Sequence, residues 1–200
     1  MKTLKMYPTS VNDVYLDEAV ECLKSGGVII YPTDSLYALG CDALNNSAIE
    51  KLCKIKGINP QKQTLSVVCD GLSMASEYAR IDNEAFRILR CNLPGAFTFI
   101  LPSSPKLPKV FKGRKAVGIR VPDNAIATAI ASRLGNPILS TSAHSEGEEL
   151  ADPQILGDEY GNVASLLIDG GECDGLSSTV VDIIDSRNPE IIREGKGDLQ

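Results

Sequence analysis

Hydroxyl-bearing side chains stand beside three short apolar segments of this sequence, and a ligand site could be built from them. They are Thr33 to Ser35 after an apolar run, Ser140 to Ser142 after another, and Ser177 to Thr179 before a third. In α/β proteins, ligands lie in the crevice at strand ends, where hydroxyls and backbone N–H groups converge. Three such segments would bind a polar ligand without adding formal charge. The alternative is that these residues form turns and helix caps, as they commonly do.

Arg120 is the second residue that points to chemistry, because it lies within the apolar run 116–122. A guanidinium is costly to remove from water unless it meets an anion, and its planar fork fits a carboxylate through two hydrogen bonds. We therefore expect Arg120 to hold an anionic ligand. The alternative is an arginine on an edge strand that points to water.

Several common catalytic motifs are absent. Neither G-x-x-x-x-G-K-[ST] nor G-x-G-x-x-G occurs, so the standard phosphate-binding loops are missing. G-x-S-x-G is absent as well, and Ser142 lies too close in sequence to the single histidine, His144, to form a convincing nucleophile pair with it. The six cysteines include no C-x-x-C pair, so we expect no metal site and instead buried free thiols in a reducing compartment.

The charge is acidic overall but unevenly distributed. A net charge of −6 argues against a protein that coats nucleic acid by overall attraction. Two basic clusters stand out nevertheless: Lys51, Lys54, Lys56 and Lys62, and then Lys106, Lys109, Lys112, Arg114 and Lys115. They favour one specific anion, such as a triphosphate or a stretch of RNA, and the alternative is that both are solvated faces. No apolar run is long enough to cross a membrane and no export signal is present, so we expect a cytoplasmic protein.

Helical and extended patterns alternate along the chain and must position these residues. Apolar spacing predicts helices over 16–23, from a capping box at Ser47, from a cap at Asp82, and over 126–134 with Gly135 as C-cap. Strands are predicted over 28–31, 65–68, 97–101, 116–121, 138–141, 164–168, 179–184 and 190–193. The last strands follow one another without helices. We therefore expect one α/β domain over 1–200, with its core at about 13–197, built on a twisted, mixed, open sheet flanked by helices.

Six segments in sequence order resemble the YrdC/YciO family, which includes the threonylcarbamoyl-AMP synthases. They are YPTDS at 31–35 with YALG at 37–40, PGAFT at 94–98, VGIRVP at 117–122, STSA at 140–143, STVVD at 178–182 and REG at 193–195. Within the family, the sequences of these segments are most similar to the YciO branch. The resemblance implies a concave, positively charged cleft and a nucleotidyltransferase that joins L-threonine, bicarbonate and Mg²⁺-bound ATP into threonylcarbamoyl-AMP for tRNA modification. ATP would be a substrate, and no tightly bound cofactor is implied.

The resemblance also assigns residues to two groups. Ser35, Arg120, Ser140 and Ser178 match positions that hold threonine, with Arg120 on its carboxylate and the serines on its hydroxyl and amine. Lys56, Ser142 and Arg193 match positions that face ATP, with Lys54 as a helper. No residue is assigned as acid, base or nucleophile, because positioning and neutralisation of the phosphates would supply most of the catalysis.

Two departures from the synthase pattern leave other functions open. Lys54-Ile55-Lys56 stands where the synthases have K-x-R, and Ser142-Ala143-His144 stands where they have S-x-N. A lysine is a point charge and cannot reproduce the bidentate grip of an arginine on phosphate. The alternatives are a protein of this fold that binds tRNA or double-stranded RNA without synthase activity, and a hydrolase that acts on a threonylcarbamoylated substrate.

Overall fold

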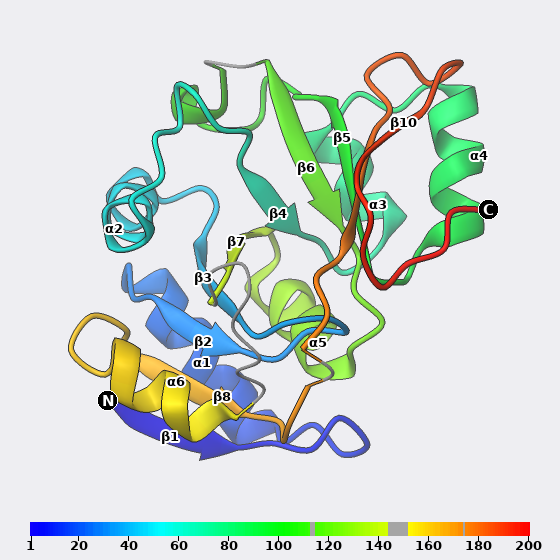
Figure 1. Ribbon diagram of the computed structural model, residues 1–200. Coiled ribbons are helices and arrows are strands. Elements are labelled where there is room, and N and C mark those ends of the chain that lie inside the picture. The colour runs from blue at the N-terminus through cyan, green and yellow to red at the C-terminus, as the bar shows by residue number, and fades with distance from the viewer. Residues whose placement is uncertain (113–114, 144–151, 174) are drawn as a thin grey trace.

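A ten-stranded mixed sheet forms the centre of the computed structural model, which describes residues 1–112, 115–143, 152–173 and 175–200 (Figure 1). The strand order is β1-β8-β2-β3-β7-β4-β6-β5-β9-β10. The strands are β1 Lys2–Lys5, β2 Ile29–Tyr31, β3 Ala38–Asp42, β4 Ser66–Val68, β5 Phe97–Pro102, β6 Ala116–Arg120, β7 Ile138–Ser142, β8 Leu166–Asp169, β9 Thr179–Asp182 and β10 Glu190–Arg193. Four of the strand pairs are parallel and five are antiparallel. The expected α/β class with a mixed open sheet is therefore confirmed.

Six α-helices and one short 3₁₀ helix surround the sheet in the described part of the chain. They are α1 Asp13–Lys24, α2 Asn46–Lys56, α3 Leu72–Tyr78, α4 Asn83–Asn92, α5 Ala125–Leu134, α6 Pro153–Tyr160 and the 3₁₀ helix η1 Lys109–Lys112. Asp82 caps α4 as predicted, and Gly135 ends α5 with a φ of 81°. The capping box predicted at Ser47 is wrong. Asn45 caps α2 by accepting from the Ala48 N–H, because an Asn in extended backbone two residues earlier offers an equally good acceptor.

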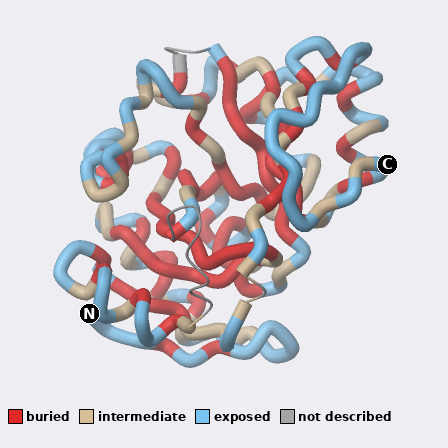
Figure 2. The backbone as a smooth tube through the Cα atoms, in the orientation of Figure 1, coloured by how far each residue is buried: buried red, intermediate tan, exposed pale blue. Residues whose placement is uncertain are grey.

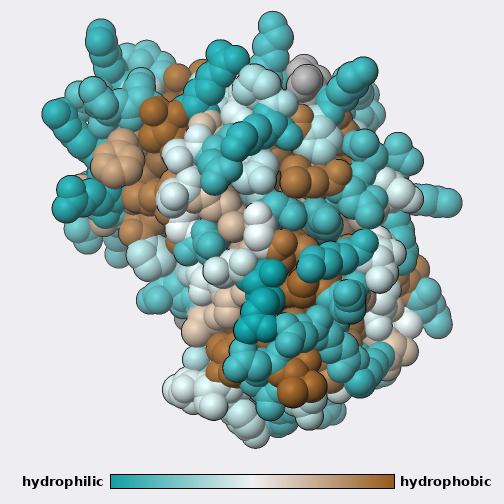
Figure 3. Space-filling view, turned by 180° about the vertical axis from the view of Figure 1, so that it is seen from behind, coloured by the Kyte–Doolittle hydropathy of each residue, from teal (hydrophilic) through white to brown (hydrophobic). Residues whose placement is uncertain are grey.

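Two apolar clusters lie on opposite faces of the sheet. Figure 2 shows most of the strands between them as buried, and Figure 3 shows hydrophilic residues over much of the outer face seen from behind, with hydrophobic residues between them. Helices α1 and α5 pack against one cluster, whereas α2, α3, α4 and α6 contribute to the other. The thiols of Cys41, Cys53 and Cys69 are buried and free as predicted, and burial raises the pKa of Cys69 to about 12. Among the described residues, no helix has the length and apolar character that a membrane crossing needs.

Five elements were not predicted from the sequence, and the short 3₁₀ helix η1 is one of them. Strand β1 lies before residue 13 and pairs in parallel with β8, so the sheet begins earlier than the expected core. Strand β3 contains Gly40, which weakens a strand pattern, and it follows β2 closely as its antiparallel neighbour. Helix α3 is short and starts after Gly71 without a side-chain cap. Helix α6 begins with Pro153 beside the residues that lie outside the described ranges.

Candidate functional site

Small residues in neighbouring strands leave a hollow in the sheet. Ser140 of β7 pairs with Ser66 of β4, and Ser66 pairs with Gly118 of β6. A Cβ atom on Gly118 would lie 2.3 Å from the Ser66 Oγ and 3.0 Å from the Thr98 Cγ2. A side chain at residue 118 would therefore displace Ser66, which lines an open space together with Ser140.

A cavity of about 260 Å³ occupies this hollow and gathers most of the residues expected to bind a ligand. Six of them line it: Ser35, Arg120, Ser140, Ser142, Ser178 and Arg193. They come from the loop after β2, from β6 and β7, and from the two ends of the β9–β10 hairpin. The three hydroxyl-rich segments therefore converge, although the first lies more than a hundred residues before the other two in the sequence.

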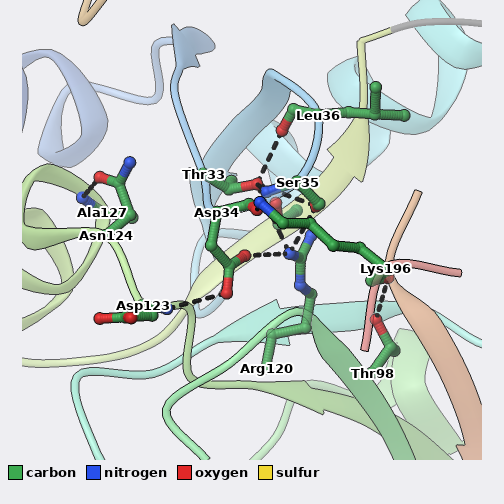
Figure 4. A network of polar contacts seen from close by, with 12 residues as sticks. Thr33, Asp34, Ser35, Leu36, Thr98, Arg120, Asp123, Asn124, Ala127 and Lys196 are labelled. Atoms are coloured by element: carbon green, nitrogen blue, oxygen red, sulfur yellow. Dashed lines mark hydrogen bonds and ion pairs between the residues drawn. The ribbon is translucent and has the colours of Figure 1, made fainter. Parts of the chain in front are cut away.

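Arg120 is fixed by the loop after β2 (Figure 4). Its Nη2 donates to the Ser35 Oγ at 2.9 Å, to the Asp34 Oδ1 at 3.0 Å and, more weakly, to the Thr33 Oγ1 at 3.5 Å. The residue is 9% exposed, and its strand β6 lies between β4 and β5. The alternative of an edge-strand arginine that points to water is therefore wrong.

One donor of this guanidinium lacks a partner among the described residues. The Arg120 Nε is buried and makes no hydrogen bond within the described part of the chain. Buried donors are nearly always satisfied, so an orphan at a cavity wall points to a ligand acceptor. Both carboxylate oxygens of Asp34 are engaged, since Oδ2 accepts from the Asp123 N–H at 2.8 Å while Oδ1 holds Arg120.

Asp34 is the residue of this site that sequence reasoning missed. Its side chain is 7% exposed, and it neutralises Arg120 within the protein. It stands between two hydroxyl residues in the first segment, and it precedes Arg120 by more than eighty positions. An acidic residue beside hydroxyls could have signalled a partner for the buried arginine, but only the fold shows which cation it meets.

The C-terminal segment forms the opposite rim. The Arg193 Nη2 donates to the Ser178 carbonyl at 2.9 Å, and the Ser178 Oγ lies 3.0 Å from the Thr98 Oγ1. Lys196 reaches across to the loop after β2, where its Nζ donates to the Asp34 carbonyl at 2.8 Å (Figure 4). Close backbone packing fixes the segment, because a Cβ on Gly195 would lie 2.4 Å from the Ser177 carbonyl oxygen.

The two lysines expected to face ATP do not line the cavity. The Lys56 Nζ donates to the Ala143 carbonyl at 3.2 Å and to the Tyr160 hydroxyl at 3.3 Å. Ala143 directly follows Ser142, so Lys56 lies just beyond the cavity edge. Lys54 is exposed on the last turn of α2. His144 and Arg114 lie outside the described residues.

The described lining is polar and cationic. It carries the hydroxyls of nine serines and threonines and two guanidinium groups, those of Arg120 and Arg193. Within the described ranges, no group of three or more His, Cys, Asp or Glu side chains lies close enough to hold a metal ion. The arrangement therefore suits a small ligand that carries a carboxylate and hydrogen-bonding groups.

Comparison with known proteins gives the family. The family model Sua5_yciO_yrdC, described as telomere recombination, matches residues 21–195. The uncharacterized protein YciO of Escherichia coli (strain K12) is 39% identical over 199 residues, which are 98% of this chain and 96% of that protein. A threonylcarbamoyl-AMP synthase of Coxiella burnetii is 33% identical over 166 residues, or 82% of this chain and 87% of the synthase.

Solved structures agree with this result. The crystal structure of E. coli YciO superposes with a TM-score of 0.92 at 38% identity, covering 99% of this chain and 98% of that one. Sua5 of P. abyssi, in complex with L-threonine, gives a TM-score of 0.88 at 25% identity, covering 98% of this chain and 58% of that one. From the family model and these relatives, the chain belongs to the Sua5/YciO/YrdC family.

Proposed function

We propose that the protein binds L-threonine in the cavity and ATP at the mouth of the cavity, which is its exposed end at Ser142 and Arg193, and that it forms threonylcarbamoyl-AMP. One observation carries the proposal: a buried arginine, whose Nε has no partner in the ranges that the structure describes, lines the same small cavity as Ser35, Ser140 and Ser178. The volume of about 260 Å³ is below the range typical of drug-sized ligands and suits an amino acid. A synthase relative and a threonine-bound Sua5 structure support the choice of ligand.

In this proposal the protein acts mainly by positioning its substrates. Arg120 takes the threonine carboxylate on the part of its guanidinium that Asp34 and Ser35 leave open, since these two residues already occupy Nη2. The threonine ammonium group first loses a proton to solvent, and its nitrogen then bonds to the carbon of bicarbonate with loss of water. A carbamate oxygen then attacks the α-phosphorus of ATP, and the bond to the leaving pyrophosphate breaks. Arg193 and Ser142 at the mouth would face the phosphates, and the magnesium ion would arrive with ATP as part of the substrate.

The test is an incubation with ATP, L-threonine and bicarbonate, followed by mass analysis for the adenylate and assay of pyrophosphate. We expect both products only when all three substrates are present, and omission of any one should abolish them. ATP turnover that does not depend on threonine would contradict the proposal.

The alternatives remain predictions that the same preparations can test. A hydrolase would release threonine from a threonylcarbamoylated substrate without consuming ATP. An RNA-binding protein would show affinity for tRNA or double-stranded RNA that falls steeply with salt. Lys106 of the second basic cluster already pairs with Glu77 at 2.6 Å, which reduces the charge that this cluster offers to RNA.

A further inference from the structure

Tyr31 reaches Ser140 through a gap that a glycine leaves open. Tyr31 lies on β2 and Ser140 on β7, with β3 between them. The β3 residue paired with Ser140 is Gly40, and a Cβ there would lie 2.6 Å from the Tyr31 ring. The fully buried ring therefore passes over Gly40, and its hydroxyl donates to the Ser140 Oγ at 2.8 Å.

This hydrogen bond determines what Ser140 can offer to a ligand. Burial raises the pKa of Tyr31 to about 12, so the phenol keeps its proton at neutral pH. A serine hydroxyl has one proton and two lone pairs, and Tyr31 occupies one lone pair. Ser140 is left with one donor and one acceptor on the cavity wall. A ligand hydroxyl complements both, whereas an ammonium group has no lone pair to receive the serine proton.

We propose that Tyr31 is a positioning residue that fixes the direction of the Ser140 hydroxyl, so that the site selects an amino acid with a β-hydroxyl group. The inference rests on the proposed function, since it concerns how the same cavity recognises threonine. The ligand carboxylate is assigned to Arg120, which leaves the β-hydroxyl as the group that Ser140 meets.

The experiment measures how well the protein distinguishes L-threonine from L-2-aminobutyrate, which has hydrogen in place of the hydroxyl. Dissociation constants for both come from calorimetry on the full chain. The ratio of interest is the dissociation constant of L-2-aminobutyrate divided by that of L-threonine. We expect Tyr31→Phe to lower this ratio about three- to tenfold, the effect of one neutral hydrogen bond. A general loss of packing would weaken the binding of both ligands alike and leave the ratio unchanged.

Tyr37→Phe is the matched control. Tyr37 is also fully buried. Its hydroxyl donates to the Gly171 carbonyl at 2.7 Å and accepts from the Gly170 N–H at 3.0 Å, and neither partner lines the cavity. Its loss should leave the ratio at the wild-type value. Ser140→Ala provides a second route if Tyr31→Phe does not fold, and it should lower the ratio at least as much. In the Ser140→Ala background, Tyr31→Phe should have no further effect.

The outcomes separate the two proposals. Binding of neither amino acid by the wild type would overturn the proposed function, and this inference with it. Binding of both with equal affinity, or an unchanged ratio in Tyr31→Phe and Ser140→Ala, would overturn the inference alone. An equal effect of Tyr31→Phe with and without Ser140 would show that Tyr31 does not act through that serine.

Discussion

The two ends of the cavity are built differently. At the inner end, Arg120, Ser35 and Ser140 are buried and held by hydrogen bonds from other strands and loops. At the mouth, Ser142 and Arg193 are exposed and stand at strand ends. A site fixed before its ligand arrives loses little entropy on binding, which favours a small, selective ligand. An open, exposed mouth suits a larger, charged group that remains partly in water.

This contrast predicts that inner-end changes affect both binding and folding. Arg120→Ala should weaken threonine binding by more than about 100-fold, because hydrogen bonds to a charged group are lost. It should also lower the free energy of unfolding by about 3 kcal/mol, because it leaves the buried Asp34 carboxylate without its cation. Calorimetry and urea unfolding measure the two effects.

Arg133→Ala is the control for this change. Arg133 also pairs with aspartates, Asp13 and Asp17, but it does so in water between α5 and α1. It should leave threonine affinity as it is and move the urea midpoint only slightly. Unchanged threonine affinity in Arg120→Ala would refute the assignment of the carboxylate site.

Added volume at residue 118 should disturb the cavity through Ser66 and Thr98, which line it. Gly118→Ala places a methyl group against Ser66 and Thr98, so we expect threonine affinity to fall about tenfold and stability to fall by roughly 1 to 3 kcal/mol. Gly157→Ala in α6 makes the same substitution where the nearest atom is a Leu167 methyl at 3.4 Å. It should keep affinity and gain up to about 1 kcal/mol of helix stability. Equal losses in both variants would mean that Gly118 has no special role in the cavity.

Substitutions near the mouth should change the affinity for ATP and leave the affinity for threonine as it is. Lys56→Ala removes a cation beside the end of β7, and we expect ATP affinity to fall roughly tenfold while threonine affinity stays constant. Lys54→Ala removes an exposed cation from the same helix turn and should cost about twofold or less. An ATP titration of both variants decides the matter, and no change in Lys56→Ala would remove that residue from the nucleotide site.

A region outside both ends should show the smallest effect, and only in acid. Backbone N–H groups at the start of α4 and the Ser186 hydroxyl lower the pKa of Asp82. A lowered pKa stabilises the fold above the unfolded-state value near 4, and this contribution is lost as the pH falls through the folded-state value below it. Asp82→Asn keeps a good cap without the titrating group, so its stability should fall less steeply between about pH 4 and 2. Threonine binding at neutral pH should be unaffected, and a steeper acid loss in the variant would contradict this account.

The sequence by itself determined the class of fold, most strands and the helix ends at Asp82 and Gly135, because those signals are local. Motif order was also enough to place six of the expected residues in one cavity. It could not rank Asn45 above Ser47 as a helix cap, because both side chains offer the same kind of acceptor within two residues.

The tertiary structure alone decided how those residues are used. The pairing of Asp34 with Arg120 joins residues that are 86 positions apart, and the hydrogen bond from Tyr31 over Gly40 to Ser140 joins residues that are 109 positions apart. Such contacts depend on strand order and register, which put β3 between β2 and β7 and β6 in the interior of the sheet. Residue types show which groups can bind, but long-range pairing fixes which hydrogen bonds are already taken and which remain for a ligand.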